Sequence, residues 1–155
     1  GSMGIGTPLA LGACAALAER SPGKRVVLLT GDGSFGFYPT EINSMVEMGY
    51  NPIVLIANNG GWGNELRTQP LKIERTLNAQ LGGIDYAMMA RGLGCQGMTV
   101  TEQTELEGAL DEAFASEGPI VVNVEVPEPA DGDPQRTIIY DDLVTAKSQF
   151  FSNDS

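Results

Sequence analysis

The sequence has 155 residues, of which 42% are hydrophobic, and a formal net charge of −11 at pH 7 with no histidine. This length fits one domain with a sizeable core, and the acidic balance without a Lys or Arg cluster argues against nucleic acid or an anionic membrane as partner. The absence of histidine excludes, within this chain, Ser-His and Cys-His nucleophile pairs and zinc sites with histidine ligands.

The cysteines and the apolar N-terminal run indicate the compartment. Cys14 and Cys95 have no CxxC spacing and no basic neighbour, so we expect both to be reduced core residues. The run 8–18 is rich in Ala and Leu but too short to span a bilayer, and it lacks the basic start of a signal peptide. We therefore expect a cytoplasmic protein.

The first part of the chain alternates between helix and strand patterns. Thr7 is the expected N-cap of a helix over residues 8–20. The apolar runs 26–30 and 53–57 lack polar alternation, which is typical of central strands in a parallel sheet that is covered on both faces. A helix over residues 39–48 joins them, and the three elements predict a β-α-β unit with a right-handed crossover.

The second part begins with a stretch that has no clear periodicity, from Gly60 to about Gly83, and long loops of this kind are usually functional or mobile. The elements expected after it are a helix over 85–91, a strand over 96–100, a helix over 102–115 capped by Thr101, and a strand over 120–126. This alternation predicts an α/β fold: a three-layer, doubly wound parallel sheet with helices on both faces.

Residues 127–155 form an acidic, Pro-rich and then partly apolar tail, so we expect the folded domain to comprise residues 1–126. Within the tail, Asp131-Gly132-Asp133 resembles a fragment of a calcium loop, but the remaining ligand positions are absent and a solvated turn is expected. The apolar end of the tail could pack on a partner chain or over a site, and the sequence does not decide between them.

Two polar clusters directly follow the first two predicted strands. They are Gly31-Asp32-Gly33-Ser34 and Asn58-Asn59-Gly60-Gly61. The carboxyl ends of neighbouring parallel strands meet at the edge where open α/β sheets bind ligands. The Asp32 carboxylate, the Asn59 amide oxygen and a carbonyl of the following glycines are ligands that Mg²⁺ prefers, and the N–H groups of Gly33 and Ser34 can hold phosphate. The clusters predict a divalent ion that holds a diphosphate.

A dinucleotide is the other ligand that this region suggests. Residues 31–36 read G-x-G-x-x-G after a strand, which alone is a weak signal. The dinucleotide fingerprint also requires an acidic residue at the end of the next strand, where this chain has Asn58-Asn59. It further requires a helix that begins within the glycines, whereas Tyr38-Pro39 is expected to delay the helix. A dinucleotide is therefore the less favoured ligand.

The two clusters at this separation resemble the thiamine-diphosphate signature of the acetolactate synthase and pyruvate decarboxylase superfamily. The opening residues 1–10 are similar to the segment that precedes this signature, which favours Gly1-Ser2-Met3 as native residues over an expression-tag remnant. The resemblance covers residues 1 to about 126 and implies the thiamine-diphosphate-binding fold, specifically its C-terminal, diphosphate-binding (PP-type) domain.

The resemblance implies a role for each matching residue. Asp32, Asn59 and the carbonyl of Gly61 would bind Mg²⁺, and Gly1, Met3, Gly31, Gly33 and Ser34 would contact thiamine diphosphate. Trp62 and Asn64, in the long loop, are predicted to line the substrate site. The bound cofactor would act as an electron sink for breaking or forming a carbon–carbon bond next to a carbonyl, in a 2-keto acid or an acyl substrate.

The departures from the family pattern limit what these residues can do alone. In the family, the glutamate that activates the cofactor lies in a separate pyrimidine-binding domain, which these 155 residues do not resemble, so no catalytic residue is assigned. The resemblance implies an enzyme only when another chain or a further segment supplies that domain, within an oligomer. Residues 60–64 depart from acetolactate synthases. The pattern of Phe35-Gly36-Phe37 and Trp62-Gly63 looks closer to acetolactate-synthase-like lyases and decarboxylases, including those that act on acyl-CoA. A non-catalytic cofactor-binding paralogue and a dinucleotide-binding Rossmann domain are the alternatives.

Overall fold

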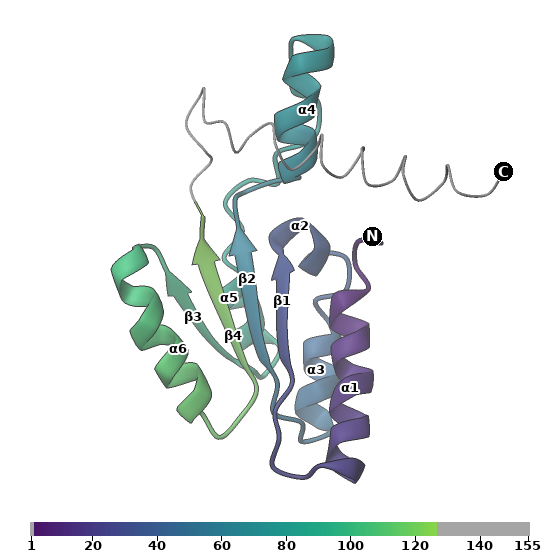
Figure 1. Ribbon diagram of the computed structural model, residues 1–155, viewed down its shortest axis with the longest axis vertical. Coiled ribbons are helices and arrows are strands. Elements are labelled where there is room, and N and C mark those ends of the chain that lie inside the picture. Colours follow the sequence, from purple (N-terminus) through teal and green to yellow (C-terminus); the bar gives the residue numbers. More distant parts are fainter. Residues whose placement is uncertain (1, 127–155) are drawn as a thin grey trace, which may run out of the picture.

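A computed structural model of the chain describes residues 2–126, except for the side chain of Leu71. Gly1, the Asp131-Gly132-Asp133 turn and the whole tail lie outside the described residues. The helices are α1 (Gly6–Arg20), α2 (Asp32–Phe35), α3 (Glu41–Glu47), α4 (Gly63–Ile73), α5 (Tyr86–Gly92), the 3-10 turn η1 (Gln103–Glu105) and α6 (Leu106–Ala115) (Figure 1). The strands are β1 (Val27–Gly31), β2 (Ile53–Asn58), β3 (Gln96–Val100) and β4 (Ile120–Glu125). No helix within residues 2–126 has the length and apolar character needed to cross a bilayer.

The strands form a four-stranded sheet in the order β1-β2-β4-β3, and every neighbouring pair is parallel. The predicted β-α-β unit is confirmed, since β1 pairs directly with β2 and Val27 lies opposite Ile53. Because all four strands run the same way, their carboxyl ends meet at one edge, which is the upper edge in Figure 1.

Helices cover both faces of the sheet, as the apolar strand patterns predict. On one face, Val54 and Ile56 of β2 are fully buried in a core that also contains residues of α1, α3 and α5. On the other face, Ile53 packs in a second core with Ala113 of α6. Each such aliphatic side chain contributes about 1.5–3 kcal/mol when it is fully buried. The three-layer α/β architecture is therefore confirmed.

The expectation that β1 is a central strand covered on both faces is wrong for the described part of the chain. There β1 is an edge strand, and Val27 and Leu29 on its α6 side are 47% and 73% exposed. Leu28, which points to the opposite side, packs against the first core. Hydropathy alone cannot tell an edge strand from a central one, because both show an uninterrupted apolar run.

Three local expectations also need correction. Helix α1 begins one residue before Thr7, which is buried within the first turn and caps nothing. The cap before α6 is a capping box between Glu102 and Glu105, and Thr101 takes no part as N-cap. The stretch after β2 contains the helix α4, which stands out from the body of the molecule (Figure 1). Helix α4 makes few contacts with the other helices and strands. The glycines just before it and Pro70 within it favour a loop, which is why the sequence did not predict this helix.

Arg25 connects the segments at the lower edge of the sheet through hydrogen bonds to their backbone carbonyls. Arg25, just before β1, donates from Nε to the carbonyl of Asn51 at 2.9 Å and from Nη1 to the carbonyls of Ala113 and Ser116 at 2.9 and 3.0 Å. Its Nη2 also donates to the carbonyl of Gly118 at 3.1 Å. The guanidinium thus satisfies orphan carbonyls at the end of α6 and places a positive charge at the negative end of that helix.

Candidate cofactor site

The carboxyl ends of β1 and β2 border a cavity of about 430 Å³. Eight residues predicted for the site line it: Gly31, Asp32, Gly33, Ser34, Asn59, Gly61, Trp62 and Asn64. Met3 does not line this cavity and is 54% exposed, and Gly1 lies outside the described residues. Most of the residues singled out from the sequence therefore come together in one place.

Asp32 is the most constrained polar residue of the site. It is the first residue of α2 and only 2% exposed, and its Oδ2 has no hydrogen-bond partner within the described part of the chain. Burial raises the pKa of this carboxyl group, while the N–H groups of Gly33, Gly61 and Gly60 act in the opposite direction. A buried carboxylate oxygen without a partner is costly unless a proton or a cation occupies its free side. The site is thus suited to a hard cation.

The surrounding donor set indicates which kind of cation fits. Among residues 2–126, no three His, Cys, Asp or Glu side chains gather as a metal-binding group. A cation beside Asp32 would need its other ligands from amide and backbone oxygens and from a bound anion. Asn59 and Gly61 line the same cavity and offer such oxygens. This composition fits Mg²⁺, which usually takes one or two carboxylates and completes its shell with phosphate oxygens and water.

Gly61 is held by a short antiparallel bridge to Gln80. The Trp62 N–H donates to the Ala79 carbonyl, and the Leu81 N–H donates to the Gly60 carbonyl, each at 2.8 Å. In extended backbone, the N–H and C=O of one residue point to the same side, opposite to those of its neighbours. Since the Gly61 N–H faces Asp32, its carbonyl also turns away from Gln80, toward the cavity.

The adjacent residues Asn58 and Asn59 have different roles. Asn58 is used within the protein, because its Nδ2 donates to Oδ1 of Asn123 and its Oδ1 accepts from the Gly60 N–H, both at 3.0 Å. Asn123 lies on β4 and is only 2% exposed. These contacts shape the turn after β2 and leave Asn59 to border the cavity. Sequence reasoning missed Asn123, although a lone polar residue in the apolar run 120–126 was the available signal.

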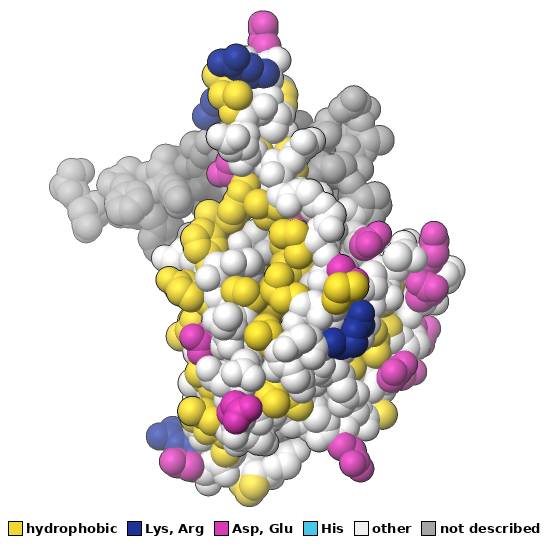
Figure 2. Space-filling model, turned by 180° about the vertical axis from the view of Figure 1, so that it is seen from behind, with side chains coloured by type: hydrophobic (Ala, Val, Ile, Leu, Met, Phe, Trp, Pro, Cys, Tyr) yellow, Lys and Arg dark blue, Asp and Glu magenta, His cyan; other side chains and the backbone are white. Residues whose placement is uncertain are grey.

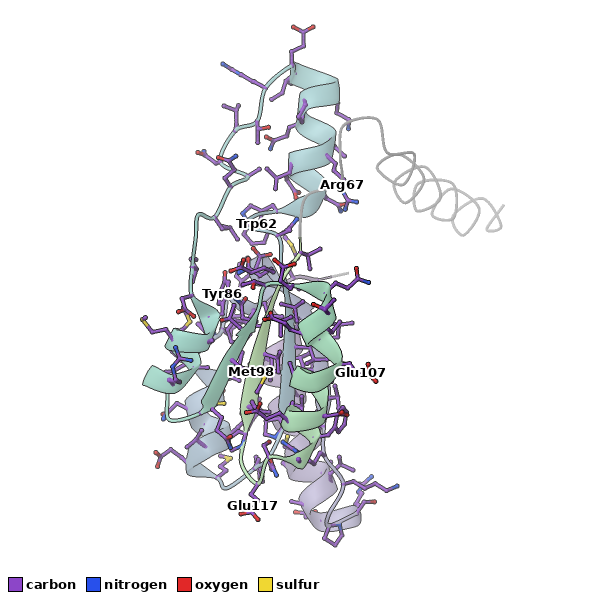
Figure 3. The ribbon with its side chains drawn as sticks, turned by 90° about the vertical axis from the view of Figure 1, so that its left-hand side faces the viewer. Trp62, Arg67, Tyr86, Met98, Glu107 and Glu117 are labelled. Atoms are coloured by element: carbon purple, nitrogen blue, oxygen red, sulfur yellow. The ribbon has the colours of Figure 1, made fainter. Side chains whose placement is uncertain are left out.

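The indole of Trp62 lies directly against the backbone of Gly33. A Cβ added at Gly33 would come within 2.6 Å of Trp62 Cε3 and Cζ3, so only glycine fits beneath the ring. Phe37 packs against the same indole, with ring centroids 5.7 Å apart. Figure 3 shows Trp62 at the foot of α4, above the sheet. Trp62 therefore covers Gly33, which is one of the predicted phosphate-binding residues.

Two further contacts connect the site to the rest of the domain. The Ser34 hydroxyl accepts a hydrogen bond from the Gly4 N–H at 3.0 Å, which ties the N-terminal turn to α2. Beneath the site, the Tyr86 hydroxyl donates to the Asp32 carbonyl at 3.3 Å, and its ring meets Phe35 edge-on. Burial, with a smaller effect of the Asp32 charge, raises the pKa of Tyr86 to about 12. It therefore stays protonated as a donor. Sequence reasoning missed Tyr86, which reads as an ordinary core aromatic.

The position of α2 corrects one of the two reasons for disfavouring a dinucleotide, namely the expected delay of the helix. A helix does begin within the glycine motif, at Asp32, so Tyr38-Pro39 does not delay it. This helix ends after four residues, at Phe35. The other reason still holds: the dinucleotide fingerprint needs an acidic residue at the end of β2, and this strand ends at Asn58 and is followed by Asn59.

Comparison with known proteins identifies the family. Residues 1–124 match the family described as thiamine pyrophosphate enzyme, C-terminal TPP binding domain. The chain is 39% identical over 117 residues to an indole-3-pyruvate decarboxylase of Azospirillum brasilense, covering 75% of this chain and 20% of that protein. It is 38% identical over 138 residues to an acetolactate synthase large subunit of Mycobacterium tuberculosis, covering 88% and 24%.

Solved structures show the same likeness. A thiamine diphosphate-dependent 4-hydroxybenzoylformate decarboxylase of Rhodococcus jostii superposes with a TM-score of 0.72 at 30% identity, covering 82% of this chain and 24% of that one. The chain thus spans between a fifth and a quarter of the length of these relatives. With the cavity at the carboxyl ends of β1 and β2 and its two polar clusters, these matches show that the chain belongs to the thiamine pyrophosphate enzymes and corresponds to their C-terminal TPP-binding domain.

Proposed function

We propose that the chain binds thiamine diphosphate through Mg²⁺ in the cavity at the ends of β1 and β2. The observation that carries this proposal is the buried Asp32 carboxylate, whose Oδ2 has no partner among the described residues. A cation at this oxygen removes the cost of the unpaired charge, and its own remaining charge attracts a diphosphate. The family match supports thiamine diphosphate as the source of that diphosphate.

The roles that we propose follow the lining of the cavity. Asp32, Asn59 and the Gly61 carbonyl would hold the metal, and the backbone at Gly31, Gly33 and Ser34 would hold the diphosphate. Trp62 and Asn64 would line the substrate side. The proposed contact of Gly1 and Met3 with the pyrimidine rests on the resemblance alone.

The proposed activity is that of a lyase, decarboxylase or synthase acting next to a carbonyl, and the relatives' names support a 2-keto acid as substrate. The bound cofactor would supply an electron sink for the carbon–carbon bond that breaks or forms. The chain's own residues would position the cofactor and exclude water. Mg²⁺ dependence, the substrate class and a cytoplasmic, oligomeric enzyme are parts of this proposal.

We also propose that a pyrimidine-binding domain, on another chain or a further segment, completes the active site. Large hydrophobic side chains beside the cavity support this. Met3, Phe37 and Tyr38 are 54%, 51% and 50% exposed, and Gly4 lies against both aromatic residues. Seen from behind, hydrophobic side chains gather below the foot of α4, while acidic side chains lie mostly toward the rim (Figure 2). An apolar surface with a polar rim is typical of a protein interface.

The test is a calorimetric titration of the chain with thiamine diphosphate, with Mg²⁺ present or removed by EDTA. We expect binding that depends on Mg²⁺ and is lost in Asp32→Ala. Binding that is unaffected by EDTA and by Asp32→Ala would contradict the metal assignment. Pyruvate consumption after mixing with a pyrimidine-domain partner, compared with binding alone, distinguishes an enzyme from a non-catalytic paralogue.

A further inference from the structure

Among the described residues that line the cavity at the ends of β1 and β2, Arg67 is the only Lys or Arg. It lies in the second turn of α4, where its Nε donates to the Gly63 carbonyl at 2.9 Å. This bond fixes the plane of the guanidinium. Within residues 2–126, the two Nη groups have no hydrogen-bond partner. Figure 3 shows Arg67 at the foot of α4, near the level of Trp62.

The negative charge of the cavity and of a bound diphosphate favours a positively charged side chain at this position. Its other ionisable lining residues within 2–126 are Asp32 and Glu65, both acidic, in a chain whose net charge is −11. A bound diphosphate carries more negative charge than one divalent ion beside Asp32 neutralises. Each excess negative charge in a partly enclosed cavity is unfavourable unless a cation or N–H donor faces it.

We infer that Arg67 is a further diphosphate-binding residue, which donates from its free Nη groups to phosphate oxygens of the cofactor. The inference rests on the proposed function and extends it to a residue that the sequence motifs do not mark. A guanidinium held at Nε presents its remaining donors in a fixed fork, which suits phosphate oxygens. Arg67 would also connect α4, which packs on little else, to the bound cofactor.

The carboxylate of a 2-keto acid is the other anion that could meet Arg67. A cation placed on that group would stabilise the bound substrate more than the transition state, because the negative charge leaves the carboxylate as the bond to it breaks. Only interactions that strengthen in the transition state accelerate the reaction. The diphosphate keeps its charge throughout, so binding it at Arg67 has no such cost.

The test compares Arg67→Gln with Arg75→Gln. Arg75 lies just beyond α4, is exposed and does not line the cavity, so its replacement makes the same change in net charge. The full chain is titrated with thiamine, thiamine monophosphate and thiamine diphosphate in the presence of Mg²⁺. We expect Arg67→Gln to weaken diphosphate binding by about tenfold or more and to leave thiamine binding unchanged. Arg75→Gln should change neither by more than about twofold.

Each outcome decides between the proposals. If the unmodified chain binds the diphosphate no better than thiamine, the proposed diphosphate site itself fails. If it prefers the diphosphate and Arg67→Gln keeps that preference in full, the inference about Arg67 fails alone. An equal loss for all three ligands would show a structural role and overturn the inference. Arg67→Lys, which keeps the charge but loses the fork, should bind the diphosphate with intermediate affinity.

Discussion

Replacing Asp32 by Asn should make the ligand-free domain more stable and remove its response to the cofactor. The substitution keeps the shape of the side chain and removes its charge. A buried charged group without a partner costs about 1–3 kcal/mol or more, and the N–H groups of Gly33, Gly60 and Gly61 offset part of this cost. We expect a net gain of about 1 kcal/mol, or about 4 °C in the melting temperature for a domain of this size.

The pH dependence gives this prediction a second readout. Burial raises the pKa of Asp32 in the folded state above its unfolded value. The folded state therefore binds this proton more tightly, and the unmodified domain loses stability as the pH rises through the folded pKa. The advantage of Asp32→Asn should be largest at neutral pH and should shrink as the pH falls toward about 4.

The assay is thermal and urea unfolding followed by circular dichroism, with and without Mg²⁺ and thiamine diphosphate. At a ligand concentration of about one hundred times Kd, the unmodified chain should gain about 2.7 kcal/mol, whereas Asp32→Asn should gain nothing. The order of stability should therefore reverse when the ligands are added. A variant that is less stable without ligand at neutral pH would refute the account of Asp32 as an unsatisfied charge.

Three further predictions concern the fold. Gly97→Ala should lower the unfolding free energy by about 1–3 kcal/mol in a urea titration, because the added methyl group meets the backbone of Ala87. Gly12→Ala is the control: its methyl group would meet none of the described residues, so the unfolding free energy should instead rise by about 0.5–1 kcal/mol. Arg25→Met should lower the unfolding free energy by about 2–3 kcal/mol through the carbonyls that it leaves unpaired, and an equally stable variant would contradict the role given to the guanidinium. Burial raises the pKa of Cys95 to about 12, so mass spectrometry should find it unmodified by iodoacetamide at pH 8 in the native chain and alkylated in urea.

The strand positions and the site clusters could be predicted because local patterns determine them. The strand over 96–100 has the expected bounds, and β2 differs by one residue. Asp32 and Asn59 line one cavity because parallel pairing of β1 and β2 brings the following turns together, and the apolar runs already predict that pairing. The free, buried state of Cys14 and Cys95 is also confirmed.

The features that the sequence did not predict depend on contacts between distant residues. The Tyr86 hydroxyl meets the Asp32 carbonyl across 54 positions, and Asn58 meets Asn123 across 65. The edge position of β1 depends on which strands lie beside it, which hydropathy does not report. Arg67 belongs to α4, whose helical state was not predicted because the glycines before this helix and Pro70 within it favour a loop. The domain boundary near residue 126 and the roles of the site residues remain predictions.

The exposed face of β1 links the stability of this domain to whatever surface covers that strand. Leu29, at 73% exposure, and Val27, at 47%, lie on a strand whose other face is packed. Each would contribute up to about 1.5–3 kcal/mol once covered, which is a considerable part of the net stability of a typical domain. Any surface that covers them binds the folded state and not the unfolded one, so folding and assembly become one linked equilibrium. The melting temperature would then rise with the concentration of whatever covers β1.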